Sequence, residues 1–212
     1  MKLRIATIIS TCLVVLPLAL AGCDEQSEKT AAEAGTVKAS PAYLEHFGQP
    51  PTPEEGTCFA RVGFYSLRDD PDKIRAVPFF LYRETGQLQQ LLERLVSGAV
   101  PLPPESGLVS PFPEETSVAV QSRDEGGVTL DLIFNDRQPS GQDLKAIAAV
   151  LTETAVQFEA VESVVILRDG KPLPGAPKEG YRHAPERVSA VKSPVLFMVI
   201  ADWQEGQSGP EE

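Results

Sequence analysis

The stretch that decides the fold runs from Ser117 to Phe134 and reads SVAVQSRDEGGVTLDLIF. Apolar residues alternate with polar ones on either side of the DEGG sequence at Asp124–Gly127, and acid–glycine pairs of this kind favour tight turns between strands. We therefore predict a β-hairpin with strands Ser117–Gln121 and Val128–Phe134. Because side chains alternate between the two faces of a strand, the core-facing residues of the second strand should be Val128, Leu130, Leu132 and Phe134.

A helix and a further strand are predicted downstream of the hairpin. Ser140 and Asp143 have the spacing of a capping box, so the helix should begin there. Ser163–Leu167 is a predicted strand, and Asp169-Gly170 is typical of the tight turn that would follow it. The apolar stripe of the predicted helix consists of Leu144, Ile147, Ala148, Leu151, Ala155 and Phe158.

Upstream of the hairpin, the alternation predicts strands at Phe59–Ser66 and Lys73–Tyr82. Pro78 cannot donate a hydrogen bond to a neighbouring strand, so the second of these should lie at a sheet edge or carry a bulge. Thr85 has the chemistry of an N-cap and Gly98 that of a helix end. The apolar face of the helix between them consists of Leu88, Leu91, Leu92 and Leu95.

These elements predict the α+β class, with two main helices packed on one face of a small mixed or antiparallel sheet. We expect a single domain over residues 58–175, and a loop and C-terminal strand over residues 176–202 that pack on it. The strand would be the apolar run Val195–Ile200. Residues 203–212 are expected to be a disordered tail.

The N-terminal sequence predicts a location outside the cytoplasm. A short basic start is followed by an apolar run, Ile5–Leu20, as in a secretory signal peptide. Leu20-Ala21-Gly22-Cys23 resembles the bacterial lipobox, which implies removal of residues 1–22 and attachment of acyl chains such as palmitate to Cys23. The alternative is a leader that ends near a cysteine by chance. Asp24 resembles a signal for retention in the inner membrane, so the expected location is extracytoplasmic and lipid-anchored, on the periplasmic face if the cell is Gram-negative.

Residues 23–57 are rich in Ala, Glu, Ser, Thr, Gly and Pro, which predicts a flexible tether behind the lipidated cysteine. The patch Tyr43–Phe47 interrupts this composition. It could dock back on the domain or remain in solvent, and the sequence leaves both open.

Charge and cysteine content exclude several classes of partner. Removing a leader that carries Lys2 and Arg4 and no acid takes the net charge from −11 to −13. A chain this acidic repels phosphate backbones, so nucleic acid is not an expected partner, and the membrane should be reached through the acyl chains on Cys23. Once Cys12 leaves and Cys23 is lipidated, Cys58 has no disulfide partner in its own chain and should point inward from its strand. The alternatives are an intermolecular disulfide and a reactive thiol.

The middle of the chain also resembles a known family. The segments that carry the resemblance are, in order, Leu91–Leu95 (LLERL) with Gly98, Gly107–Pro113 (GLVSPFP), Glu114–Thr116 (EET), Leu130–Leu132 (LDL), Leu151–Thr154 (LTET), Val164–Ile166 (VVI) and Asp169-Gly170. Together they resemble the GerMN domain, named for a sporulation and germination protein. The resemblance covers about residues 59–173. It departs from the family pattern at Ala99, where Pro is usual, and at Glu115, where Gly is usual.

The GerMN resemblance implies a secreted or lipid-anchored envelope protein whose domain binds a ligand or assembles with partners, with no established catalytic residues. We therefore expect no enzyme, no cofactor and no metal site. Glu114 and Asp131 are the nearest candidates for a hydrolase pair. The acidic run Asp69-Asp70-Pro71-Asp72 is more typical of a solvated turn than of a calcium site. Neither His46 nor His183 stands at a zinc-binding spacing.

Two segments are candidate binding surfaces. The first is the Pro- and Gly-framed loop, in which an exposed Phe112 is expected, with Gly107, Leu108, Ser110, Phe112 and Thr116 as candidate ligand-binding residues. Its apolar members could instead cover the helix ends as part of the core. The second is the basic late segment, which could meet an anionic wall polymer or lipid headgroups, or remain a solvated loop. Its basic residues are Lys171, Lys178, Arg182, His183, Arg187 and Lys192.

The resulting functional prediction is a non-catalytic module that binds a peptidoglycan-like cell-wall ligand or an envelope protein complex. A scaffold that docks a partner envelope protein is the alternative, and a cell-wall hydrolase is a third hypothesis.

Overall fold

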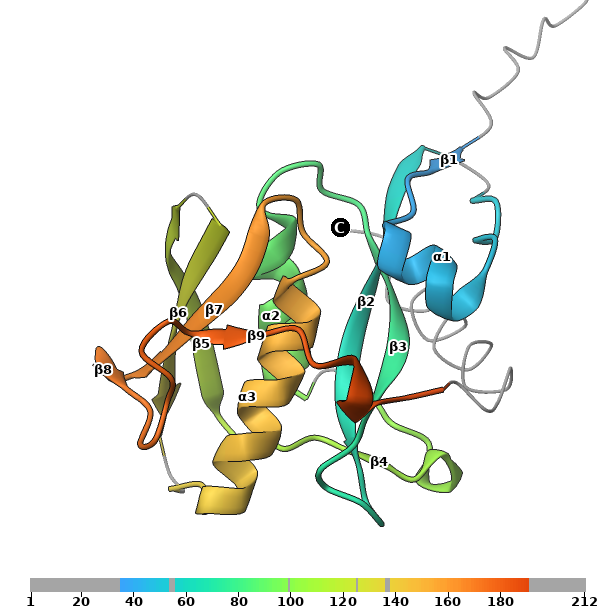
Figure 1. The fold of residues 1–212 in the computed structure, drawn as a ribbon. Coiled ribbons are helices and arrows are strands. Elements are labelled where there is room, and N and C mark those ends of the chain that lie inside the picture. The colour runs from blue at the N-terminus through green and yellow to red at the C-terminus, as the bar shows by residue number, and fades with distance from the viewer. Residues whose placement is uncertain (1–34, 54–55, 99, 125, 136–137, 191–212) are drawn as a thin grey trace, which may run out of the picture. The chain divides into compact units, whose positions relative to one another are not determined.

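The computed structural model describes residues 35–190 except 54–55, 99, 125 and 136–137, all within the compact unit Glu33–Glu212. Its strands form two sheets (Figure 1). The longer helices, α2 (Gln87–Val96) and α3 (Gly141–Ala155), lie between them, and α3 contacts strands of both. The predicted α+β class is therefore confirmed, with two sheets where the sequence suggested one.

The first sheet has the strand order β1-β2-β3-β10, and β4 also pairs with β2. Its central pair confirms the predicted strands at residues 59–66 and 73–82. Pro78 pairs with Val62 of β2 and lies beyond the residues of β3 that β10 covers, Ile74 and Arg75. Among the described strands, Pro78 therefore lies at a sheet edge, as predicted. The bounds are Thr36–Val37 for β1, Thr57–Leu67 for β2, Ile74–Leu81 for β3, Leu108–Val109 for β4 and Val188–Ser189 for β10.

The second sheet has the order β5-β6-β7-β8, and β9 also pairs with β7. The predicted hairpin is confirmed as the antiparallel pair β5–β6, and the parallel neighbour β7 is reached through α3. The four residues predicted to face the core from β6 are buried. The bounds are Thr116–Asp124 for β5, Gly126–Phe134 for β6, Val161–Arg168 for β7, Lys171–Pro172 for β8 and Tyr181–Arg182 for β9.

Helix α3 begins as its sequence predicts. Ser140 accepts a hydrogen bond from the Asp143 backbone, and the Asp143 carboxylate accepts one from the Ser140 backbone, which completes the capping box. The N-cap predicted for α2 at Thr85 is wrong. Gly86 caps that helix, with a φ of 67° that glycine adopts without strain, and no side chain caps the helix start. The predicted apolar face of α2 is buried.

Part of the predicted tether is folded. Strand β1 pairs with β2, and helix α1 (Pro41–Phe47) begins at Ser40, whose hydroxyl accepts a hydrogen bond from the Tyr43 backbone. Tyr43 is fully buried and lies edge-to-face with Phe80 at 5.9 Å. The prediction of a flexible tether up to residue 57 is therefore wrong for residues 36–47, because the Tyr43 side chain and the pairing of β1 attach this segment to the first sheet.

Two glutamines pair with open sheet edges. The Gln157 side chain, just after α3, accepts a hydrogen bond from the Val62 backbone N–H at 2.9 Å and donates to the Val62 carbonyl. Gln89 on α2 donates to the Val118 carbonyl at 2.9 Å and accepts from the Val120 N–H at 2.8 Å. Each amide thus replaces a missing neighbouring strand at a point where a helix covers the edge.

Several predicted features lie outside the described residues, namely the leader, Cys23, the strand Val195–Ile200 and the tail. In the part of the chain that the structure describes, no helix has the length and apolar character needed to cross a membrane. Short 3₁₀ helices occupy Pro104–Ser106 and Pro185–Arg187.

Candidate functional site

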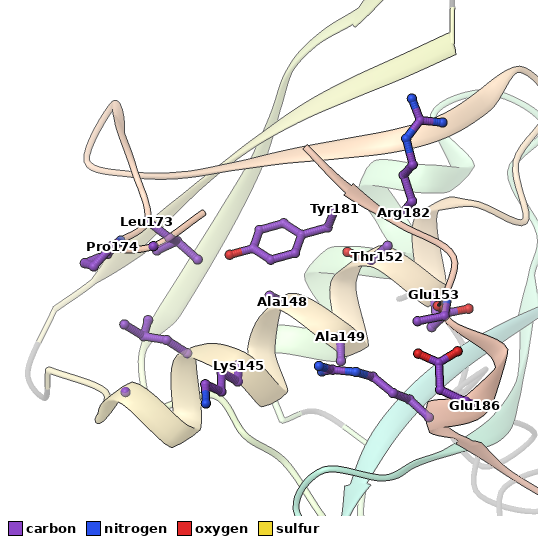
Figure 2. A pocket seen from close by; sticks show the side chains of 15 residues that line it. Lys145, Ala148, Ala149, Thr152, Glu153, Leu173, Pro174, Tyr181, Arg182 and Glu186 are labelled. Atoms are coloured by element: carbon purple, nitrogen blue, oxygen red, sulfur yellow. Dashed lines mark hydrogen bonds between the residues drawn. The ribbon is translucent and has the colours of Figure 1, made fainter. Parts of the chain in front are cut away.

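A groove of about 500 Å³ lies between α3 and the late segment of residues 173–187 (Figure 2). Residues distant in the chain meet there, because β9 returns along the sheet edge and passes α3. The groove is lined by Gly141, Leu144, Lys145, Ala148, Ala149, Thr152, Glu153, Leu173, Pro174, Gly175, Tyr181, Arg182, Ala184, Glu186 and Arg187.

A buried carboxylate holds the late segment against α3. Glu153 is 4% exposed; its Oε2 lies 2.5 Å from His183 Nδ1, and its Oε1 accepts a hydrogen bond from the Ala184 backbone N–H at 2.7 Å. Both carboxylate oxygens are thus engaged, which a buried carboxylate requires. Glu153 therefore fixes the wall of the groove, and its charge is already partnered.

The groove has an apolar floor, and its lining includes two polar groups, the Tyr181 phenol and the Thr152 hydroxyl. Ala148 and Ala149 leave space beside the helix, and Figure 2 shows the Tyr181 ring across it with the phenol oxygen directed toward Leu173. Burial raises the pKa of Tyr181, so its phenol stays a hydrogen-bond donor. Thr152 is 2% exposed, and its hydroxyl has no hydrogen-bond partner among the described residues.

Cationic side chains stand on the rim of the groove. Lys145 and Arg182 are exposed and Arg187 is half-buried. The described lining has two acidic residues: Glu153, which is engaged with His183 and Ala184, and the exposed Glu186. The surplus of positive charge is local, because the whole chain carries −11. An anionic ligand would thus be favoured here over the rest of the surface.

The predicted ligand loop, residues 107–116, lies at a different hollow. This hollow of about 370 Å³ includes Val109, Ser110 and Phe112 together with Arg68 and Asp143. Of the five candidate ligand-binding residues, Ser110 is exposed and Gly107 half-buried, whereas Leu108, Phe112 and Thr116 are buried. Leu108 belongs to β4, and the Thr116 hydroxyl donates to the Pro113 carbonyl at 2.6 Å. A ligand role for this loop stays a prediction.

The expectation of an exposed Phe112 is wrong. Its side chain is 8% exposed and belongs to the hydrophobic core. The Ser110 hydroxyl accepts a hydrogen bond from the Phe112 backbone at 3.3 Å, in a turn that directs the ring inward. The alternative interpretation, in which the apolar residues of the loop cover the core, therefore holds for Leu108 and Phe112.

The acidic residues considered for catalysis or metal binding either stabilise a turn or are exposed to solvent. Asp131 accepts a hydrogen bond from the Gly170 backbone at 3.0 Å and so stabilises the turn after β7, whereas Glu114 is exposed. Asp69, Asp70 and Asp72 are exposed in the β2–β3 turn. Within the described residues, no group of three or more His, Cys, Asp or Glu side chains is arranged to hold a metal ion.

Cys58 and the histidines are also placed by the structure. Cys58 is 2% exposed, which confirms that it points inward, and burial raises its pKa. His46 stacks edge-to-face on Phe64 at 5.8 Å. The contact of His183 with Glu153 could not be predicted from the sequence, because a glutamate on the apolar helix α3 gives no local signal for it.

These features define a class: a two-sheet α+β domain with a polar-rimmed groove beside its longest helix. The chain belongs to the Germane family, described as "Sporulation and spore germination", whose model matches residues 64–174. The GerMN resemblance predicted from the sequence is thereby confirmed.

Two solved structures are similar to this chain. The chain is similar to the tandem GerMN domains of the sporulation protein GerM from Bacillus subtilis, with 22% identity and a TM-score of 0.46 over 60% of this chain and 45% of that one. It is similar to the first GerMN domain of the same protein at 22% identity and a TM-score of 0.45, over 59% of this chain and 93% of that one. The chain thus spans less than half of the tandem structure. A comparison with curated proteins finds no significant match.

Proposed function

We propose that the chain is a non-catalytic binding module of the cell envelope, anchored by acyl chains on Cys23, which holds a cell-wall ligand in the groove beside α3. The observation that carries the proposal is the groove itself, where a basic rim surrounds an apolar floor on an otherwise acidic chain. Binding sites commonly combine an apolar concave floor with a few placed polar groups. Peptidoglycan-like polymer is the proposed ligand because it is anionic and lies within reach of an anchored envelope protein.

The anchor has its own test. Replacing Cys23 by Ala in the full chain removes the thiol that would be acylated, so the variant should take up no labelled fatty acid and should accumulate as an unprocessed precursor. Labelling of the Cys23→Ala variant at the wild-type level would contradict the anchor.

Wall binding can be tested by cosedimentation of the full chain, kept in detergent, with purified cell-wall sacculi at low and moderate salt. The wild type should sediment with the sacculi at both salt concentrations. An Arg182→Gln/Arg187→Gln variant should bind at least about tenfold more weakly, since loss of two charge-assisted contacts corresponds to roughly 1.4 kcal/mol or more.

The matched control is Lys171→Gln/Lys178→Gln, which removes the same charge from two exposed positions outside the groove lining, one on β8 and one in the late segment. It should keep wild-type binding. Equal losses in the two variants would indicate non-specific attraction. No sedimentation at either salt would favour the alternative function, a scaffold for another envelope protein.

A further inference from the structure

We infer that the groove takes a short, extended peptide that carries carboxylates, and that the Thr152 hydroxyl is the hydrogen-bonding group in its floor. This inference rests on the proposed function and names the class of ligand. Three observations lead to it: the length of the groove, the unpartnered hydroxyl and the distribution of charge.

The groove has the dimensions of a peptide site. Its lining along α3 extends from Gly141 to Glu153, which at 1.5 Å per residue is about 18 Å of helix. An extended chain rises about 3.3 Å per residue, so roughly five or six peptide residues would lie along it. The small side chains of Ala148 and Ala149 leave room for the side chains of such a peptide.

Thr152 is the second observation. A buried hydroxyl without a hydrogen-bond partner is unfavourable in the free protein. Figure 2 shows Thr152 on the side of α3 that faces Tyr181, within the groove lining. A peptide carbonyl or carboxylate in the groove would accept a hydrogen bond from this hydroxyl, and the buried polar group would then be satisfied.

Charge favours an acidic peptide over a sugar chain. Lys145 lies near the start of α3 and Arg182 and Arg187 on the late segment, so the cations stand on both walls of the groove. Tyr181 is the only aromatic ring among the described lining residues. Sites for sugar rings usually offer more aromatic surface, whereas cations on both walls suit carboxylates spaced along an extended peptide.

The chain itself offers a matched pair of variants. Thr152 and Thr154 lie on the same helix, are both buried, and both have hydroxyls without a partner in the described structure, yet only Thr152 lines the groove. Thr→Val keeps the shape of the side chain and removes the hydroxyl. Neither variant should lower the melting temperature, because the hydroxyl removed from each was unsatisfied.

The test is a calorimetric titration of the full chain in detergent with a hexapeptide of alternating Ala and Glu. A peptide with Gln in place of Glu and an oligogalacturonate of equal charge serve as comparison ligands. The Glu peptide should bind at least about tenfold more tightly than either. Thr152→Val should weaken its binding by about three- to tenfold, as expected for one hydrogen bond, and Thr154→Val should leave it unchanged.

Equal affinity for the Glu and Gln peptides, tighter binding of the oligogalacturonate, or equal effects of the two threonine variants would overturn the inference. Sacculus binding without peptide binding would also overturn it while leaving the proposed function intact. If the peptide binds with the expected variant pattern but sacculi do not bind, the peptide site is supported and the cell wall is rejected as the source of the peptide ligand.

Discussion

Glu115 has a backbone φ of 58°, in the left-handed region where residues with a Cβ are strained. Its position is also where the family pattern usually has glycine. The strain explains that preference, because glycine adopts this conformation at low cost. The departure seen in the sequence thus corresponds to a local cost in stability at the start of β5.

Glu115→Gly should therefore stabilise the domain by up to about 1 kcal/mol, since relief of strain exceeds the extra entropy of the unfolded chain. Thermal unfolding should show a melting temperature higher by roughly 2–4 °C. Glu114→Gly, at an adjacent exposed residue without positive φ, is the control and should not stabilise. A lower melting temperature for Glu115→Gly would contradict the strain.

His46 gives the domain a predicted pH dependence. Partial burial beside Phe64 lowers the pKa of His46 below 6.5, although Glu45 and Glu153 act in the opposite direction. The unfolded chain therefore binds a proton more readily than the folded one. Stability contributed by the neutral ring is present above pH 6.5 and is lost as the pH falls toward the lower, folded-state pKa.

Melting temperatures measured between pH 8 and pH 5 should fall more steeply for the wild type than for His46→Gln, because the glutamine side chain does not bind a proton in this pH range. The two proteins differ only at position 46, so the difference between the two curves reports on His46. Parallel curves would show that the His46 pKa is the same in the folded and unfolded states.

At the scale of single residues, the sequence predicted what depends on near neighbours. The capping pair Ser140–Asp143 and the buried Cys58 follow from local spacing and were confirmed. Phe112 was predicted wrongly because the turn that buries it depends on contacts with the rest of the core. The Glu153–His183 contact joins residues 30 positions apart, and no periodicity marks it.

At the scale of elements, two glutamine side chains, Gln89 on α2 and Gln157 just after α3, hydrogen-bond to the backbone of sheet edges. Gln157→Ala would leave the Val62 N–H and carbonyl without their partner at a part-buried edge. We expect a loss of about 1–3 kcal/mol in the free energy of unfolding, the usual cost of an unsatisfied buried polar group.

Chemical denaturation of Gln157→Ala and Gln89→Ala should show this loss, and Gln121→Ala should serve as control. Gln121 is exposed on β5 and should change the free energy of unfolding by less than about 0.5 kcal/mol. A Gln157→Ala protein as stable as the control would mean that water satisfies the Val62 backbone.

Element length decided which elements could be predicted. The longer strands β2, β3, β5, β6 and β7 and the helices α2 and α3 have a clear period and were all predicted. Strands β1, β4, β8, β9 and β10 have two residues each. Such short strands have no periodicity of their own and form only because a partner strand is already in place.

At the scale of the whole molecule, the sequence supported the class and the family but could not divide the strands between two sheets. That division depends on which strands α2 and α3 cover, and both helices present ordinary apolar faces. The groove arises for the same reason, since it joins α3 to a segment that follows it by several elements. Only the basic excess around Arg182 and Arg187 indicated it in advance.

The central claim is that the groove beside α3 holds cell-wall material, and photo-crosslinking in intact cells tests it most directly. A photoreactive amino acid would replace Glu186, an exposed lining residue that is not one of the proposed cationic contacts, with Lys171 replaced in a matched control. We predict an adduct from position 186 that shrinks when the glycan is cut with a muramidase, and little adduct from position 171. An adduct with another protein alone, or equal yields of wall adduct from the two positions, would contradict the claim.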